Sequence, residues 1–287
     1  MARGQQAVAA ERGVPAPCPL APLYPLDAGV FGHDLVGHPL LSLAALADAA
    51  ARMNPAHVEL RAANRGAGGD FAMAADAAAR APGTICAIAD SGCWAMLRFA
   101  EQLPDYRALM EQALAPFAAL VEARTGPMRD CRAFIFISSA AMVTPFHCDP
   151  EYNILFQIMG DKDFRTFPPA EPWLTAADEE RLHATGDNLL PWDDAYAQQG
   201  CNHRLAPGDA LFVPFKAPHV VTVAQGPSIS LSLTWKSDWS LAQDAAHRCN
   251  RALRQLGLNP RPIPPWPRRA AGKALAARVL HRAGLTP

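Results

Sequence analysis

Two histidines and one aspartate have the spacing of metal ligands that leave one side of the metal open. His147 and Asp149 are two residues apart in a stretch that we expect to be extended, and side chains two apart on a strand point to the same face. His219 follows much later, after a Pro-Gly-Asp turn and a short apolar run. Two histidines and a carboxylate on one side of a metal are typical of non-haem Fe(II) oxygenases, whose open positions take cosubstrate and dioxygen. We therefore expect these three residues to bind Fe(II).

A lysine lies a short distance after this aspartate. Two apolar runs flank the turn Met159–Asp161 and predict a hairpin with Lys162 at the start of its second strand. If Lys162 faces the metal ligands, Arg165 faces outward, because strand side chains alternate. A dianionic cosubstrate that chelates iron at one end needs a fixed cation at the other, and an ammonium group supplies a charge-assisted bond. The alternative is a solvated turn lysine between Asp161 and Asp163.

The elements that must position these residues are short strands with helices before and after them. Gly and Pro punctuate the predicted strands, which lie at 134–137, 143–149, 153–158, 163–167, 210–214, 219–224 and 228–235. Helical spacing predicts helices at 43–50, 105–124, 241–256 and 268–281, with Ser42 and Ser240 as N-caps and a capping-box pattern from Thr175 to Asp178. The pattern indicates a mainly β protein with flanking helices, built on a double-stranded β-helix of the cupin or jelly-roll type.

Composition divides the chain into four parts. Residues 1–27 are rich in Ala, Pro and Gly and are expected to be a flexible N-terminal segment. Residues 28–130 form a helical or mixed part that packs on the core. Residues 131–237 form the core itself, with 168–200 as an insertion or lid beside the site. Residues 238–287 form a basic, helical C-terminal extension.

These motifs resemble those of the cupin-like JmjC family of Fe(II)/2-oxoglutarate oxygenases, and in particular its factor-inhibiting-HIF (asparaginyl hydroxylase) branch, over roughly residues 130–236. The matching positions are Thr144, Pro145, His147, Asp149, Asn153, Gln157, Gly160, Lys162, Phe167, Pro168, Pro169, Pro207, Gly208, Asp209, Leu211, Phe212, Pro214 and His219. The resemblance implies that Lys162 pairs with the distal carboxylate of 2-oxoglutarate, while Thr144 and Asn153 hydrogen-bond it. It also implies hydroxylation of a peptide or protein side chain or of a small metabolite, coupled to decarboxylation of 2-oxoglutarate to succinate.

The last predicted strand departs from the family pattern, in which an Asn often stands shortly before a Trp. Alternation along Ser228–Trp235 places hydroxyl side chains on one face and apolar ones on the other. If the hydroxyl face points inward, Ser232 and Thr234 take the place of the Asn as cosubstrate contacts.

Composition and charge limit the other functions. The 287 residues are 50% hydrophobic and 18% charged, which is a globular balance. Seven cysteines without a CxxC pair, and no signal peptide or membrane span, indicate reduced thiols and a cytoplasmic location. The remaining histidines are expected to be surface or capping residues. Residues 251–287 hold eight basic and no acidic residues, so residues 1–250 carry a net charge of −9.

The partners follow from the site and from this basic tail. The site implies 2-oxoglutarate, dioxygen and a primary substrate that the motifs do not identify. The C-terminal helices could pair two copies in a homodimer, whereas contact of the tail with nucleic acid or an anionic membrane is not favoured, because no aromatic residues interleave with a basic patch elsewhere. Two alternatives stay open: a non-catalytic cupin-like module that binds a metal or an acidic ligand, and a metal-dependent dioxygenase without 2-oxoglutarate, which leaves Lys162 unexplained.

Overall fold

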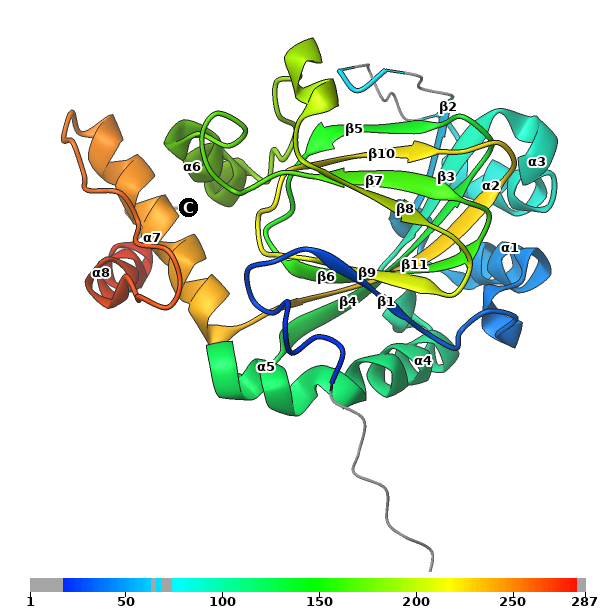
Figure 1. Cartoon of the computed structure of the whole chain (residues 1–287), viewed down its shortest axis with the longest axis horizontal. Helices are drawn as coiled ribbons and strands as arrows, with labels where there is room; N and C mark the ends of the chain where they lie inside the picture. Colours follow the sequence, from blue (N-terminus) through cyan, green and yellow to red (C-terminus); the bar gives the residue numbers. More distant parts are fainter. Residues whose placement is uncertain (1–17, 63–65, 69–73, 283–287) are drawn as a thin grey trace, which may run out of the picture.

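Two antiparallel sheets lie face to face at the centre of the protein (Figure 1). The computed structural model describes residues 18–62, 66–68 and 74–282. The larger sheet has the strand order β1 (Gly29–Gly32), β9 (Asp209–Val213), β6 (Tyr152–Met159), β11 (Ser228–Lys236), β4 (Arg129–Ser138), β3 (Cys93–Arg98) and β2 (Val58–Ala62). The smaller sheet has the order β5 (Val143–His147), β10 (His219–Val223), β7 (Lys162–Thr166) and β8 (Cys201–Leu205). The two-sheet, cupin-like architecture predicted from the strand pattern is confirmed.

Helices cover the larger sheet and both ends of the sheet pair (Figure 1). They are α1 (Leu43–Arg52), α2 (Ala77–Cys86), α3 (Ile88–Ser91), α4 (Pro104–Leu114), α5 (Ala118–Thr125), α6 (Ala176–Thr185), α7 (Asp238–Gln255) and α8 (Ala271–Arg282). Short 3-10 turns are η1 (Pro39–Leu41), η2 (Pro55–His57), η3 (Ala100–Gln102), η4 (Ala115–Phe117) and η5 (Asp194–Gln198). None of the helices in the described ranges has the length and apolarity that crossing a bilayer requires.

Alternation along β11 separates the main core from the space between the sheets. Leu231, Leu233 and Trp235 are at most 1% exposed and belong to the cluster that packs under the helices. Ser232 and Thr234 point the other way and line a cavity. The hydroxyl face therefore points into the space between the sheets, so the condition under which Ser232 and Thr234 were predicted to replace the Asn is met.

Helix boundaries follow local signals, with two corrections. Ser42 caps α1 as expected, since its hydroxyl accepts from the backbone N–H of Ala45. The single helix predicted at 105–124 is instead α4 and α5 joined by η4, because Pro116 cannot donate the backbone hydrogen bond that a continuous helix needs. The cap of α7 is Ser237 rather than Ser240, which occupies the third helical position and completes a capping box.

The predicted hairpin around Met159–Asp161 is also wrong in its pairing. β6 and β7 do follow one another across this turn, but they belong to different sheets, and β7 pairs with β10 and β8. Gly160 has φ +69°, and a Cβ added there would lie 2.1 Å from the carbonyl oxygen of Pro227. The turn therefore carries the chain from one sheet to the other, and it delivers Lys162 to the smaller sheet.

The part before residue 131 contributes to the larger sheet as well as covering it. β1 pairs with β9, and β3 joins β2 to β4. Of the segment expected to be flexible, residues 1–17 lie outside the described part. Within 18–27, Leu20 and Tyr24 are buried in the core.

Candidate active site

Three potential metal ligands meet between the sheets. His147 and His219 lie opposite each other on the paired strands β5 and β10, and Asp149 lies two residues beyond the end of β5, which is shorter than the predicted strand 143–149. Their ligand atoms all lie within 4.8 Å of one another. Asp149 Oδ2 is 3.8 Å from His147 Nε2 and 3.6 Å from His219 Nε2. The geometry thus brings together the three residues that the sequence proposed as iron ligands.

The imidazole rings are oriented for metal binding. His147 Nδ1 lies 2.7 Å from the carbonyl oxygen of Pro145, and His219 Nδ1 lies 2.9 Å from that of Ala217. A carbonyl can only accept, so each Nδ1 donates its N–H to it and each Nε2 is the ring atom placed to bind a metal. Burial, helped by the neighbouring His147, lowers the pKa of His219 to about 4 and keeps that ring neutral. The donor set therefore fits a divalent cation with open positions.

The aspartate ligand is held from two further segments. Asn188 donates from Nδ2 to Asp149 Oδ1 at 3.1 Å, and the backbone N–H of Lys216 donates to the Asp149 carbonyl at 3.1 Å. Asn188 belongs to the segment 168–200, and the next residue, Leu189, forms a β-bridge with His147. The sequence pattern contained no signal for Asn188, because its contact with Asp149 depends on how this long connection folds back.

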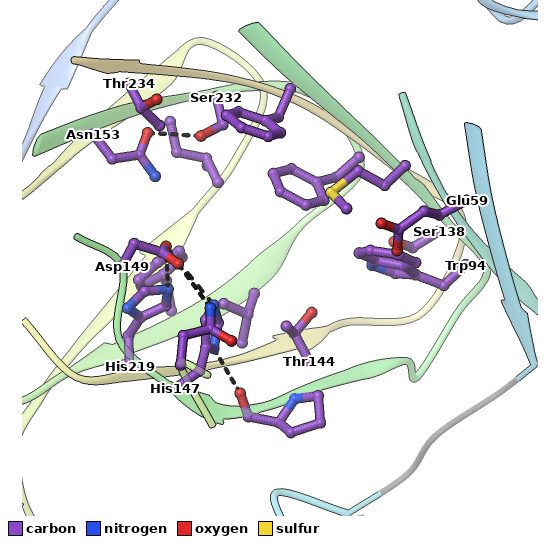
Figure 2. A pocket seen from close by; sticks show the side chains of 18 of the residues that line it. Glu59, Trp94, Ser138, Thr144, His147, Asp149, Asn153, His219, Ser232 and Thr234 are labelled. Atoms are coloured by element: carbon purple, nitrogen blue, oxygen red, sulfur yellow. Dashed lines mark hydrogen bonds and ion pairs between the residues drawn. The ribbon is translucent and has the colours of Figure 1, made fainter. Parts of the chain in front are cut away.

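A cavity of about 490 Å³ connects the ligand cluster to the other predicted site residues. It extends in two directions (Figure 2): toward Asn153, Ser232 and Thr234, and toward Glu59, Ser138 and Trp94. The lining also includes Thr144 and Lys162. All the residues predicted to contact a cosubstrate therefore face the same space as the three potential metal ligands.

Lys162 is a buried cation that faces this cavity. Its residue is 4% exposed, and burial alone lowers the pKa of its ammonium to about 7. Within the described residues no carboxylate or hydrogen-bond acceptor reaches the ammonium group. Arg165 has the opposite orientation, and its guanidinium donates to the carbonyl oxygen of Gln199. The prediction that Lys162 and Arg165 lie on opposite faces of the strand is confirmed.

The lowered pKa of Lys162 gives a prediction about stability and pH. In the folded protein this lysine loses its proton near pH 7, whereas in the unfolded chain it keeps the proton to about pH 10.4. Between these values the unfolded state binds more protons, so the stability of the ligand-free protein should rise with pH. Urea unfolding from pH 7 to 9.5 should show a steeper rise for the wild type than for Lys162→Met. Parallel curves would contradict the burial of a titrating lysine.

Polar groups on the larger sheet complete the cavity wall near the metal ligands. The Ser232 hydroxyl donates to Asn153 Oδ1 at 2.7 Å, which leaves the Asn153 amide N–H groups to donate elsewhere. Thr234 lies beside Asn153 on the neighbouring strand, and within the described residues its buried hydroxyl has no protein partner. An unpaired buried hydroxyl is costly unless a ligand or water satisfies it. These groups are therefore suited to bind a polar ligand.

Several cavity residues come from strands that the sequence did not connect with the site. Glu59 lies on β2, and Trp94 and Arg98 lie on β3. Glu151, two residues after Asp149, also faces the cavity, and burial together with Asp149 raises the pKa of its carboxyl to about 7. β2 pairs with β3 and β3 pairs with β4 across long stretches of sequence, so residue spacing alone could not reveal this wall.

A second buried polar cluster lies behind the metal ligands, between α6 and α7. His183 and His247 are each 3% exposed and stack with ring centroids 4.8 Å apart, so their prediction as surface or capping residues is wrong. Lys216, at φ +63°, pairs with Glu179 and donates to His247 Nε2 at 3.1 Å. Burial is the main cause that lowers the pKa of His247, and the positive charge of Lys216 is the second. The ring is therefore neutral and can accept a hydrogen bond. The cluster anchors the loop whose backbone holds Asp149.

Loss of the Lys216 ammonium should destabilise the fold strongly. Lys216→Ala leaves Glu179 as a largely buried carboxylate without its cation, and breaking a buried pair in this way costs roughly 3–5 kcal/mol. The free energy of unfolding from urea titration measures the loss. Arg204→Ala is the control, because its ion pair with Asp161 is exposed and such pairs contribute about 0–1 kcal/mol. Equal effects of the two substitutions would rule out an anchoring role for Lys216.

Comparison with known proteins gives local sequence similarity and a distant structural likeness. No family model matches this chain. A stretch of 105 residues is 35% identical to lysine-specific demethylase 8 of Xenopus tropicalis, and it covers 33% of this chain and 23% of that protein. The chain therefore spans less than a quarter of the length of this curated relative.

Among solved structures, Escherichia coli YcfD has a TM-score of 0.49 at 15% identity, over 89% of this chain and 64% of YcfD. YcfD, described as a ribosomal oxygenase, in complex with cobalt and 2-oxoglutarate gives a TM-score of 0.49 at 14% identity, over 93% of this chain and 65% of that one. The lyase DddQ of Ruegeria pomeroyi gives 0.25 at 21% identity, over 37% and 38% of the two chains. The strand order and the ligand cluster themselves define the molecule as a cupin-like protein with a candidate metal centre.

Proposed function

We propose that this protein is an Fe(II)- and 2-oxoglutarate-dependent oxygenase, a hydroxylase of a peptide or protein side chain or of a small metabolite. One observation carries the proposal. The buried ammonium of Lys162, unpaired within the described residues, faces the same cavity as two histidines and an aspartate placed to hold a metal. A buried cation beside a three-ligand site is suited to an elongated dianion that binds the metal at one end and the lysine at the other.

Each group then has a defined task. His147, Asp149 and His219 hold the iron, and iron supplies the redox chemistry with dioxygen when it is bound. Lys162 and Thr144 bind the distal carboxylate of 2-oxoglutarate. Near the metal, the hydrogen-bonding groups are the amide of Asn153 and the hydroxyls of Ser232 and Thr234. Lys162, Asn153, Ser232 and Thr234 are each at most 6% exposed, and burial of this kind strengthens the polar contacts that they make.

The overall reaction consumes 2-oxoglutarate, dioxygen and a substrate C–H bond and yields succinate, carbon dioxide and the C–OH product. The local identity to a lysine-specific demethylase supports the oxygenase class. The asparaginyl hydroxylase branch remains a prediction from the sequence motifs.

The division of the chain is part of the same proposal. We assign residues 131–237 as the catalytic core and 238–287 as a helical extension. Within 168–200, Gly186, Asn188 and Leu189 line the cavity, and Asn188 holds Asp149, which supports a role beside the substrate. Pairing of two copies through α7 and α8 also remains a prediction.

Succinate formation tests the proposal. Purified protein supplied with Fe(II), 2-oxoglutarate and dioxygen should form succinate slowly without substrate, and a chelator should stop it. In a thermal-shift measurement, Mn(II) and 2-oxoglutarate together should stabilise the protein more than either alone, by about 2.7 kcal/mol at a hundredfold excess over Kd. Stabilisation without succinate would favour a non-catalytic binding module, and the absence of both would exclude the proposed cosubstrate.

A further inference from the structure

Arg98 lines the cavity, Arg132 lies on the neighbouring strand β4, and each is held by a buried carboxylate. Arg98 donates to Glu59 at 3.0 Å, and Arg132 donates to Glu101 at 3.2 Å. The carboxylate residues are 6% and 8% exposed, whereas the arginine side chains are 38% and 47% exposed. Exposed surface ion pairs usually contribute little and are mobile. Here the carboxylates are fixed inside the protein, so they hold the guanidinium groups in place.

Phe99 fixes the two guanidinium groups around one ring. The Cζ atom of Arg98 lies 5.2 Å from the ring centroid and that of Arg132 lies 5.5 Å from it. The ring also packs against Phe134 and His57, with centroids 5.4 and 5.0 Å away. Phe99 has φ +57°, a left-handed conformation that costs energy for a bulky residue and persists where the surroundings over-determine it. We call Arg98, Phe99 and Arg132 the arginine rim.

The arginine rim adjoins the cavity that contains the three potential metal ligands. Arg98 and Phe134 both line the cavity that contains the three potential metal ligands. Arg132 lies directly opposite Thr234 in the β4–β11 ladder, and Thr234 in turn lies opposite Asn153. A molecule bound on the rim can therefore extend a second part along the wall toward the metal.

The donors of the rim are only partly used. Glu59 receives one N–H group from Arg98, and Glu101 receives one from Arg132. Each guanidinium keeps further N–H donors in a planar fork, a geometry that matches carboxylate and phosphate oxygens. Because the side chains are already ordered, an anion would lose little free energy in ordering them.

We propose that the arginine rim binds an oxyanion, a carboxylate or a phosphate, on a small primary substrate. This inference rests on the proposed oxygenase function, because it places the oxidised C–H bond between the anion and the metal. The Phe99 and Phe134 rings then pack against the apolar part of that substrate. In this arrangement the oxyanion of the substrate binds at the rim, whereas the 2-oxoglutarate dianion binds at the Lys162 side of the cavity.

Calorimetry with three probes of similar shape tests the proposal. Protein saturated with Mn(II) and 2-oxoglutarate under nitrogen is titrated with benzoate, phenyl phosphate or neutral benzamide. At least one anion should bind about tenfold or more tightly than benzamide, and its affinity should fall as salt is raised. The benzoate and phenyl phosphate arms distinguish the two oxyanions. Equal binding of all three probes would overturn the proposal.

Three variants locate the binding. Arg98→Gln and Arg132→Gln should each reduce the preference for the anion over benzamide by about threefold or more, and the double variant should abolish it. Arg129→Gln is the matched control, since Arg129 lies on the same strand as Arg132, is similarly exposed and pairs with Asp238. A preference that survives in the folded double variant would overturn the proposal. If that variant does not fold, the preference of the wild type for an anion over benzamide, and the salt dependence of that preference, still test the proposal.

A parallel assay separates this inference from the function on which it rests. Aerobic samples with Fe(II) are analysed for succinate alongside the calorimetry. If the protein prefers the anions but forms no succinate, the rim is still an anion-binding site, and the proposed oxygenase function is wrong. If the protein forms succinate but does not prefer the anions, only the proposed role of the arginine rim in substrate binding is wrong.

Discussion

His219→Ala should reduce Fe(II)-dependent succinate formation by at least about 100-fold, because it removes a direct ligand, and changes in the outer shell alone already cost 10–100-fold. The fold should survive, since the neighbouring β10 side chains Val220, Val221 and Val223 stay in place. The assay compares initial rates of succinate formation at saturating 2-oxoglutarate, together with the far-UV spectrum of each protein.

The control for His219→Ala is His203→Ala. His203 lies on β8 of the same sheet and contacts Thr166, not the ligand cluster. Its replacement should leave the rate within about twofold of the wild type, as expected for a residue outside the machinery. A folded His219→Ala protein with the wild-type rate would exclude the proposed ligand set.

Lys162→Met should weaken 2-oxoglutarate binding and stabilise the ligand-free protein at once. A charge-assisted hydrogen bond contributes about 1.5–3 kcal/mol, so the KM for 2-oxoglutarate should rise roughly 10- to 150-fold. Without ligand, the substitution removes a buried cation that is unpaired in the described part of the chain, so the melting temperature should rise. Steady-state kinetics and thermal unfolding measure the two effects.

The opposite signs of these two effects make Lys162→Met informative. A structural lysine would lose stability on substitution and leave the KM unchanged. Arg165→Met provides the control, because Arg165 lies on the same strand but faces outward to Gln199. An unchanged demand for 2-oxoglutarate in Lys162→Met would refute the cosubstrate role that we give this residue.

The candidate ligands could be predicted from the sequence because their signals are local. His147 and Asp149 are two residues apart in a stretch that is predicted to be a strand to Asp149; β5 ends at His147, yet both side chains reach the same site. Alternation along β7 places Lys162 and Arg165 on opposite faces. The inward hydroxyl face of β11 also followed from alternation, once the direction of the apolar face was known. Such alternation can be read from the sequence because burial of one face fixes the register of a strand in the folded protein.

The remaining features depend on contacts between distant segments. The hairpin expected before Lys162 is a crossover between sheets, since the partner of a strand depends on the whole sheet. Asn188 reaches Asp149 through a long connection. His183 and His247 are buried only because α6 packs on α7. Glu59 enters the cavity wall through the pairing of β2 with β3, which no spacing in the sequence reveals.

The most direct test of the central claim is anomalous diffraction from crystals loaded with Zn(II) and 2-oxoglutarate. We expect one strong zinc peak at roughly 2.0–2.2 Å from His147 Nε2, an Asp149 carboxylate oxygen and His219 Nε2, with the distal carboxylate of 2-oxoglutarate at the ammonium of Lys162. A fully loaded crystal with its zinc away from these three atoms, or with 2-oxoglutarate bound away from Lys162, would contradict the account.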